Sequence, residues 1–163
     1  SDNAGRGCDP AVQILAYNDI KKLVADRIVA GQDGVVNILA GMDEFGNVTG
    51  EVNADGQFQA GSIEKLIVGT ISGAGGIVNI AAGGDIEYLK ACRIVSGNGE
   101  VNVVAGGDIT ANVGRVRSWS IADETGVEFV AGGSVNDLRN SIRSEYVEEG
   151  ADVVFPDPSE VYP

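Results

Sequence analysis

The chain has 163 residues, of which 44% are hydrophobic, and this is enough to bury the core of one domain. Its formal net charge is −13 and its isoelectric point is near 4.2. This charge excludes nucleic acid and anionic membrane as natural partners, because both are bound through clustered Lys and Arg. The sequence contains no histidine, which excludes Ser-His-Asp and Cys-His catalysis and imidazole metal sites.

Residues 1–11 precede the first recognisable pattern and are expected to form an N-terminal arm. Asp9 followed by Pro10 is typical of a helix start, since proline is favoured at the first helical position. However, residues 19–31 match residues 85–97 position by position, and both phrases are rich in β-branched residues and end at glycine. The match favours strand, with helix as the alternative.

From Val12 onward one phrase returns along the chain. It is clearest at 78–86 (VNIAAGGDI) and 101–109 (VNVVAGGDI), is degenerate at 127–135 (VEFVAGGSV), and is shorter at 36–41 (VNILAG) and 12–16 (VQILA). The first valines are 24, 42, 23 and 26 residues apart, and the long interval is interpreted as hiding a degenerate coil around residues 58–63. Counting that coil, the period is 23 residues and about six coils fit.

A period in the low twenties, built from short β-branched runs divided by glycines, is typical of a β-solenoid. Val-Asn-Ile alternates apolar and polar residues as half-buried strands do, and Gly-Gly-Asp forms corners that need positive φ or a missing side chain. The predicted fold is all-β: a three-sided, single-stranded parallel β-helix over residues 12–147, with roughly 23 residues per coil.

Stacking the phrases at this period predicts two inward apolar columns. The first column contains Ile20, Phe45, Ile63, Ile86, Ile109 and Val135. The second column contains Leu23, Val48, Leu66, Leu89, Val113 and Leu138. Both columns are expected to lie in the core.

A polar column follows the glycines, with Asp or Ser at each position. Its members are Asp19, Asp43, Ser62, Asp85, Asp108 and Ser134. Stacked carboxylates supply the hard oxygen ligands that Ca²⁺ prefers, so Asp85 and Asp108 are a candidate calcium site. A structural role is favoured, because Asp and Ser after glycine bond their own backbone in Asx-type turns and the Ser replacements would remove metal ligands.

A second polar column lies inside the strands. It contains Asn37, Asn79 and Asn102, with Gln13 and Glu128 in register. These side chains are expected to point away from the core, where stacked amides can hydrogen-bond to one another. A sugar- or ice-binding face is the functional alternative, and the presence of only four threonines argues against ice binding.

The two cysteines, Cys8 and Cys92, lie about three and a half coils apart, on the order of 17 Å at strand spacing. Bonded cysteines have Cα atoms within about 7 Å, so an internal bridge would require the N-terminal arm to fold back. Either both thiols are free, or Cys8 of one copy forms a disulfide with Cys92 of another.

The Ala-Gly-Gly-Asp-Ile phrase, with Val-Asn-Ile before it, resembles the repeats of large bacterial surface β-solenoids of the filamentous haemagglutinin and adhesin type over residues 12–142. The resemblance implies secretion, a role at the cell surface or in a matrix, and contact with other chains. Bactofilin-like cytoskeletal polymers are a second, weaker resemblance. Parallel β-helices also include polysaccharide lyases and hydrolases, for which Asp85 or Asp108 with Arg93 or Arg115 are the candidate residues. The coils are too uniform for a catalytic groove, so no enzymatic activity is expected.

At the C-terminus, Leu138, Ile142 and Tyr146 fit either a last coil or a short capping helix. Residues 148–163 are expected to form an extended, proline-rich tail. Its apolar residues form an assembly tail that docks on a neighbouring copy, or alternatively on its own subunit: Val153, Val154, Phe155 and Tyr162.

Unlike ends that bind each other propagate a filament, so the predicted function is a secreted, non-enzymatic structural subunit that polymerises head-to-tail. The alternative is a glycan-binding adhesin module or a β-helical polysaccharide lyase or hydrolase. Polysaccharide is a candidate partner, and no cofactor besides Ca²⁺ is considered. Insertion into a membrane is not expected, because no run of about 18 apolar residues occurs.

Overall fold

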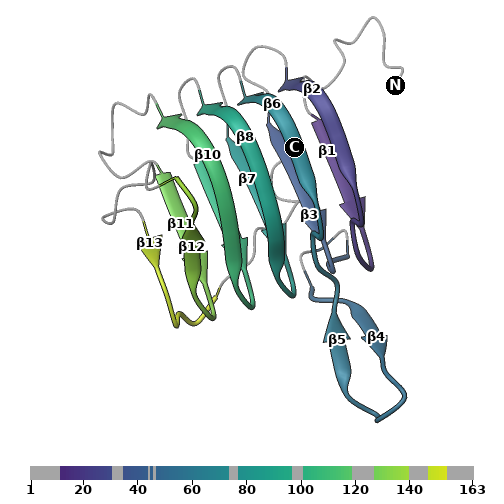
Figure 1. The fold of residues 1–163 in the computed structure, drawn as a ribbon. Helices are drawn as coiled ribbons and strands as arrows, with labels where there is room; N and C mark the ends of the chain where they lie inside the picture. Colours follow the sequence, from purple (N-terminus) through teal and green to yellow (C-terminus); the bar gives the residue numbers. More distant parts are fainter. Residues whose placement is uncertain are drawn as a thin grey trace, which may run out of the picture.

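The computed structural model describes residues 12–30, 35–43, 45, 47–73, 77–96, 101–118, 127–139 and 147–153. These residues form strands, turns and bends, with no helix among them, and therefore none that is long and apolar enough to cross a membrane. Strands β1 and β2 occupy the segment for which a helix was the alternative. Two parallel sheets lie against each other, and an antiparallel hairpin projects away from them (Figure 1). The predicted all-β, parallel architecture is thereby confirmed.

Sheet A contains six strands in the spatial order β1-β3-β7-β9-β11-β13. Their bounds are β1 (Val12–Ala16), β3 (Val36–Ala40), β7 (Val78–Ala82), β9 (Val101–Ala105), β11 (Val127–Ala131) and β13 (Val147–Glu148). The first five are the copies of the Val-Asn-Ile phrase, and they pair first valine to first valine without a shift. The sequence repeat is therefore also the register of the sheet.

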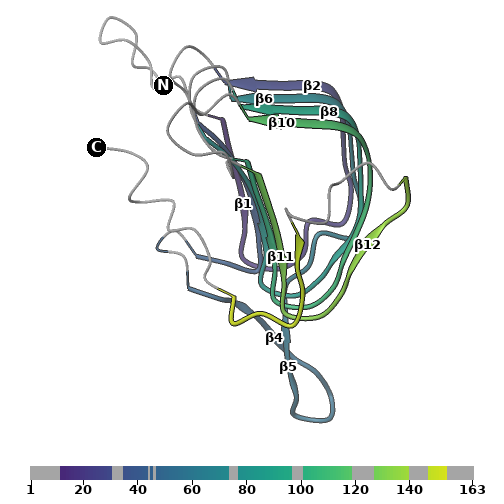
Figure 2. The same cartoon turned by 90° about the vertical axis from the view of Figure 1, so that its left-hand side faces the viewer.

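Sheet B contains five strands in the order β12-β10-β8-β6-β2. Their bounds are β2 (Leu23–Ala30), β6 (Leu66–Gly73), β8 (Ile86–Ser96), β10 (Ile109–Ser118) and β12 (Val135–Asp137). The longer strands bend partway along, so the molecule seen end-on is enclosed on three sides (Figure 2). Along the chain, strands alternate between the two sheets, and a sheet A strand with the sheet B strand that follows it is called a repeat below. This arrangement is compatible with a β-helix.

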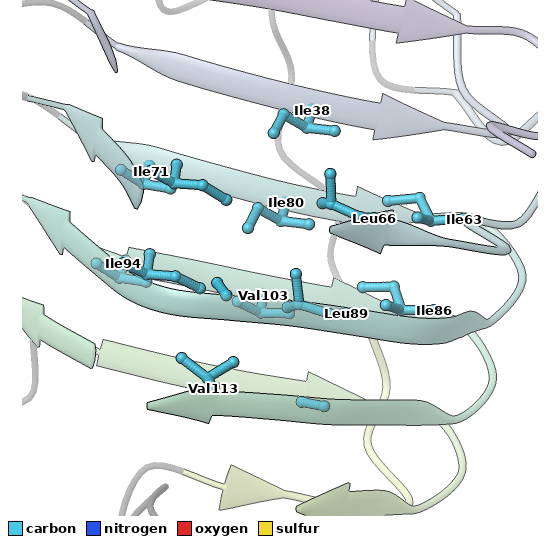
Figure 3. Packing of buried hydrophobic residues seen from close by; sticks show 14 of the residues in the cluster. Ile38, Ile63, Leu66, Ile71, Ile80, Ile86, Leu89, Ile94, Val103 and Val113 are labelled. Carbon is cyan, nitrogen blue, oxygen red and sulfur yellow. The ribbon is translucent and has the colours of Figure 1, made fainter. Parts of the chain in front are cut away.

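The core lies between the sheets and consists of aliphatic side chains stacked repeat upon repeat (Figure 3). Ile38, Ile80 and Val103 of sheet A face Leu66, Leu89 and Ile94 of sheet B in this layer. All six are fully buried. Inward and outward residues alternate along each strand, so each inward position contributes one aliphatic side chain per repeat. These side chains stack into columns that exclude water from the space between the sheets.

The expected degenerate coil around residues 58–63 is not present as such. Instead β4 (Gly50–Val52) and β5 (Phe58–Ala60) pair with each other in an antiparallel hairpin, and β3 pairs directly with β7. Removing residues 42–60 from the sequence leaves Ala-Gly-Gly-Ser-Ile, the same corner as Ala131-Gly132-Gly133-Ser134-Val135. These 19 residues account for the 42-residue interval, since 23 remain without them. The long repeat is therefore an ordinary repeat with an inserted hairpin.

The insertion also corrects the predicted apolar columns. Ile20, Ile63 and Ile86 pair in succession, so Phe45 has no place between them and is 60% exposed near the hairpin. Val48 likewise leaves the second column and forms an isolated antiparallel bridge with Met42.

Further along the second column, a register shift between β8 and β10 places Ala111 opposite Leu89, where Val113 was expected. Val113 is still a core residue, one column further on. Leu138 lies just beyond the short strand β12 and is 56% exposed.

Candidate functional site

The corner that leads from sheet A to sheet B carries a continuous row of hydrogen bonds between repeats. In each repeat the Asp or Ser side chain accepts the backbone N–H of the same position in the next repeat. The bonds run from Ser62 N–H to Asp19 Oδ1 (2.8 Å), from Asp85 N–H to Ser62 Oγ (2.9 Å), from Asp108 N–H to Asp85 Oδ1 (2.7 Å), and from Ser134 N–H to Asp108 Oδ1 (2.8 Å). These five residues are called the corner row.

The corner row confirms five of the six predicted members of the polar column but corrects their role. The side chains bond the adjacent repeat and not their own backbone, so they link repeats to one another. Asp43, the sixth member, lies at the base of the inserted hairpin. There it does form the local turn, since its Oδ1 accepts the N–H groups of Phe45 and Asn47 at 2.8 and 2.9 Å.

The second glycine of each corner makes room for this row. A Cβ on Gly107 would overlap the Asp85 carboxylate, and a Cβ on Gly133 would overlap that of Asp108. Neither glycine is among the positive-φ glycines of the described residues, which are Gly41, Gly56 and Gly150. At these corners glycine is required by space and not by backbone conformation.

The candidate calcium site at Asp85 and Asp108 corresponds to two adjacent members of the corner row. One oxygen of each carboxylate already accepts a backbone N–H. Within the described residues, no group of three or more Asp, Glu, Cys or His side chains is placed to hold a metal ion. Ca²⁺ takes six to eight oxygens, and these two carboxylates alone do not supply them.

A pocket of about 450 Å³ lies between the corner row and the hairpin. Five carboxylates and one ammonium group line it, together with small and amide residues: Asn18, Asp19, Lys21, Glu51, Gln59, Ala60, Gly61, Ser62, Glu64, Asp85 and Glu87. Glu51 and Gln59 come from β4 and β5, so the insertion forms one wall of the pocket. Asn18 Nδ2 donates to Glu51 Oε1 at 3.1 Å and attaches that wall to the first repeat.

The electrostatics of this acidic pocket are repulsive. Partial burial raises the pKa of Glu87 above its ordinary value of 4.5, and the neighbouring charges of Glu64, Asp85 and Asp19 raise it further. Desolvation and like charges both disfavour the ionised carboxylate. The pocket therefore favours cations over anions.

The predicted amide ladder is confirmed. Asn79 Nδ2 donates to Asn37 Oδ1 at 2.8 Å, and Asn102 Nδ2 donates to Asn79 Oδ1 at 3.0 Å. Asn37 is fully buried and Asn79 is 4% exposed, so this part of the outer face of sheet A is covered and does not form an open binding face. The Nδ2 of Asn37, at the start of the ladder, has no hydrogen-bond partner among the described residues.

A second apolar cluster covers the outer face of sheet A. It is formed by Leu39, Met42, Ala81 and Val104, with Leu15 and Val153 packed against it. Val153 of the predicted assembly tail thus lies on its own subunit, where Ala151 N–H also bonds Ala131 O at 3.0 Å. Val154, Phe155 and Tyr162 lie outside the described residues, and a docking role for them stays a prediction.

On sheet B, Cys92 is an exposed free thiol, and Cys8 lies outside the described residues. Cys92, Arg93 and Arg115 line a hollow at the bend of the sheet, together with Gly114 and Arg139. The structure does not bring these arginines to Asp85 or Asp108. Eight residues of extended chain, about 26 Å of path, separate Asp85 from Arg93, and the two line different hollows.

Several residues of both hollows are absent from the sequence-based predictions. The sequence does not identify Glu51, because the period predicts a coil where the hairpin lies. It does not identify Glu87, because the aligned position of the first phrase is a lysine, Lys21. The interrupted corner, Ala40-Gly41 resuming at Gly61-Ser62, is the sequence signal that identifies the insertion. No comparable signal indicates Arg139, which reaches the hollow from the end of β12.

Comparisons with known proteins provide no relative: no protein-family model, no curated protein and no solved structure matches this chain.

Proposed function

We propose that the chain is a single-stranded parallel β-helix that serves as a non-enzymatic structural subunit and polymerises head-to-tail by stacking of its end repeats. The alternation of strands between the sheets supports the winding. Five repeats each contribute to both sheets and β13 begins a sixth, at a period of about 23 residues once the hairpin is set aside. The resemblance to bacterial surface repeats supports an extracellular filament or surface fibre as its setting.

The observation that carries the proposal is the open edge of the first repeat. No described strand pairs with the outer sides of β1 and β2. The inward residues Val12, Ile14 and Leu23 are only half-buried, although their counterparts in the middle repeats are fully buried. Val24 of β2 is 56% exposed. An edge with unpaired backbone and exposed apolar side chains is a template for another chain.

At the opposite end of the molecule, the last strands are covered more completely on sheet A than on sheet B. On sheet A, β13 pairs with β11, and Glu149 Oε2 accepts the N–H of Val135 at 2.7 Å where a further repeat would offer a carbonyl. On sheet B, β12 covers only the first three positions of β10. Residues 114–118 of β10 lie beyond β12 and have no described strand on that side. They offer a parallel edge that the open edge of β2 can extend.

The test is to block the edge of β2. Leu23 N–H bonds Lys65 O, so Val24, the next residue, directs its own N–H toward the open side. Val24→Pro removes that donor, and Val24→Lys places a charge on the edge without changing the backbone. Val24→Thr is the matched control, because it keeps both the N–H and the β-branched shape.

Light scattering over a concentration series and negative-stain electron microscopy measure the outcome. We expect filaments from the wild type and Val24→Thr, and monomers with unchanged β-sheet circular dichroism from Val24→Lys and Val24→Pro. A wild type that is monomeric at every concentration, or that stops at a closed dimer, contradicts head-to-tail assembly.

A further inference from the structure

We propose that the hollow at the bend of sheet B is a binding site for an oxyanion, the carboxylate, sulfate or phosphate group of a ligand. This site lies on a different part of the surface from the acidic pocket, and two of its residues, Gly114 and Arg115, lie on the segment of β10 whose edge the proposed assembly uses. Its volume is about 470 Å³, and its lining consists of Cys92, Arg93, Gly114, Arg115 and Arg139. Three of these five residues carry guanidinium groups, and none carries a carboxylate.

The register of sheet B brings the arginines together. Arg93 and Arg115 are direct neighbours on β8 and β10, so their Cα atoms lie about one strand spacing apart, roughly 4.8 Å. Arg139 approaches from the end of β12, and all three are exposed. Guanidinium groups at this spacing can donate in pairs to the oxygens of one planar or tetrahedral anion.

Glycine leaves the hollow open at the bend. A Cβ on Gly114 would lie 2.7 Å from the carbonyl oxygen of Cys92, so the position accepts no side chain. Gly69 has the same relation, at 2.5 Å, to the carbonyl of Asp26. The neighbouring strand therefore requires glycine at position 114, and no side chain lies beside Arg115 at the bend.

The hollow is positively charged, whereas the chain as a whole is negatively charged. The chain carries 24 acidic and 11 basic residues, so three arginines with no carboxylate among the described lining residues form a local reversal of sign. The carboxylates on the strands of sheet B are Asp26 of β2, Glu87 of β8 and Asp137 of β12, and Asp137 Oδ1 accepts the backbone N–H of Arg139 at 3.0 Å. Like charges held close together repel, and a bound anion relieves that repulsion. The overall charge of −13 selects a small anionic group over a nucleic acid.

The experiment titrates the folded protein with sodium sulfate and sodium phosphate and follows backbone and arginine side-chain NMR signals, against sodium chloride at equal ionic strength. We expect saturable shifts at residues 92–93, 114–115 and 139. The combined Arg93→Gln and Arg115→Gln variant is expected to bind at least about tenfold more weakly, since it removes the paired donors. Lys90→Gln, which removes one positive charge from the exposed face of the same strand, is the control and is expected to bind as the wild type does.

A third arm compares free sulfate with a sulfated disaccharide, which distinguishes a free ion from a group carried by a glycan. Tighter binding of the disaccharide assigns the glycan as source, and equal binding assigns the free ion. Shifts that are unsaturable, that chloride reproduces, or that Lys90→Gln reduces as much as the double variant overturn the site. The titration is repeated on Val24→Lys, the variant expected to be monomeric, so that loss of anion binding is distinguished from coverage of Arg115 by a neighbouring copy.

Discussion

At the residue scale, the Gly-Gly-Asp corner links each repeat to the next. The carboxylate of Asp85 accepts the N–H of Asp108, and the same carboxylate occupies the space that a side chain on Gly107 would need. Ser62 performs the same role with a hydroxyl, which explains why Asp and Ser alternate freely at this position. The glycine and the acid of successive repeats are therefore coupled across the stack.

This coupling predicts a non-additive pair of substitutions. Gly107→Ala is expected to destabilise the fold by about 2 kcal/mol, because its methyl group displaces the Asp85 carboxylate. Asp85→Ala is expected to cost about 1–2 kcal/mol through the unpaired N–H of Asp108. In the double variant the methyl group has room. The loss in the free energy of unfolding is therefore expected to be smaller than the sum of the two single losses by about 1 kcal/mol, a coupling typical of residues in contact.

Urea denaturation of the four proteins of this cycle provides the measurement. Asp85→Ser is the conservative control, since serine supplies an acceptor at the equivalent position of the long repeat. Strictly additive free energies of unfolding would show that glycine and carboxylate do not share space.

The acidic pocket predicts a pH dependence that can be assigned to one residue. The raised pKa of Glu87 means that the folded chain holds this proton more tightly than the unfolded chain does. Its contribution to stability is therefore present at low pH and is lost as the pH rises from the ordinary value of 4.5 through the raised value. Glu87→Gln removes the ionisation and is expected to stabilise the protein at pH 7 by about 0.3 kcal/mol, the scale of an exposed, solvent-screened interaction.

Thermal unfolding of wild type and Glu87→Gln at pH 7 and pH 3.5 tests this assignment. The difference is expected at pH 7 only and is expected to shrink in 1 M salt, where screening acts over about 3 Å. Glu148→Gln, on β13 and outside the pocket, is the control. A variant that is less stable than the wild type at pH 7 would contradict the repulsion.

At the element scale, the inserted hairpin is separable from the repeat that carries it. A Cβ on Gly41 would lie 2.6 Å from the backbone nitrogen of Gly61, so the two ends of the insertion lie side by side. The hairpin has its own turn, in which Asn53 Oδ1 accepts the N–H groups of Asp55 and Gln57 at 2.9 Å each. It also exposes a cross-strand apolar pair, Val52 and Phe58. Insertions of this kind on a rigid scaffold commonly carry function.

Deleting residues 42–60 and joining Gly41 to Gly61 is therefore expected to leave both sheets intact. The cost is expected to be about 2–3 kcal/mol, because the fully buried Met42 is lost from the outer face of sheet A. Circular dichroism and a cooperative thermal transition measure the result. Deletion of residues 61–79, which has the same length but removes β6, is the control and is expected to unfold the chain. Equal loss of structure in both deletions would contradict the insertion.

At the scale of the whole molecule, asymmetry between the two ends is the feature on which the proposed assembly rests. The first repeat has half-buried core positions, whereas Phe129 of the last full repeat is completely buried and closes the core with the largest side chain of its column. The exposed thiol of Cys92 can form a disulfide with another copy, and such a disulfide would report which residues of two copies lie close together. A disulfide from Cys8 to Cys92 of the next copy would join subunits in one direction only.

Non-reducing electrophoresis of the oxidised protein tests this bridge. A Cys8–Cys92 bridge predicts a ladder of multimers that reducing agent collapses, because each copy offers both partners. Cys8→Ser and Cys92→Ser are each expected to abolish the ladder. Dimers alone, retained in Cys8→Ser, would show that Cys92 pairs with Cys92 of another copy.

Much of this architecture could be predicted from the sequence, because its information is periodic. The alternation in Val-Asn-Ile assigns one face to the core, and identical neighbours at a constant interval predict both the sheet A register and the amide ladder. The sequence predicts the column of corner residues for the same reason, but it does not predict that their side chains bond the next repeat. Because the sequence period is also the spatial repeat of the strands, the sequence alone predicts which residues are neighbours in sheet A.

Only the tertiary structure decided which residues of different repeats meet in hollows, and that the 42-residue interval contains a hairpin. An insertion shifts the numbering of every later residue without shifting the stack, so counting along the chain assigned Phe45 and Val48 to a core that they do not enter. The acidic pocket and the arginine hollow combine residues whose proximity depends on strand pairing and on the bend of sheet B. The sequence period determines where strands and corners form. Which side chains of different repeats lie close together depends on strand register and on the bend of sheet B, and the sequence of a single repeat does not determine either.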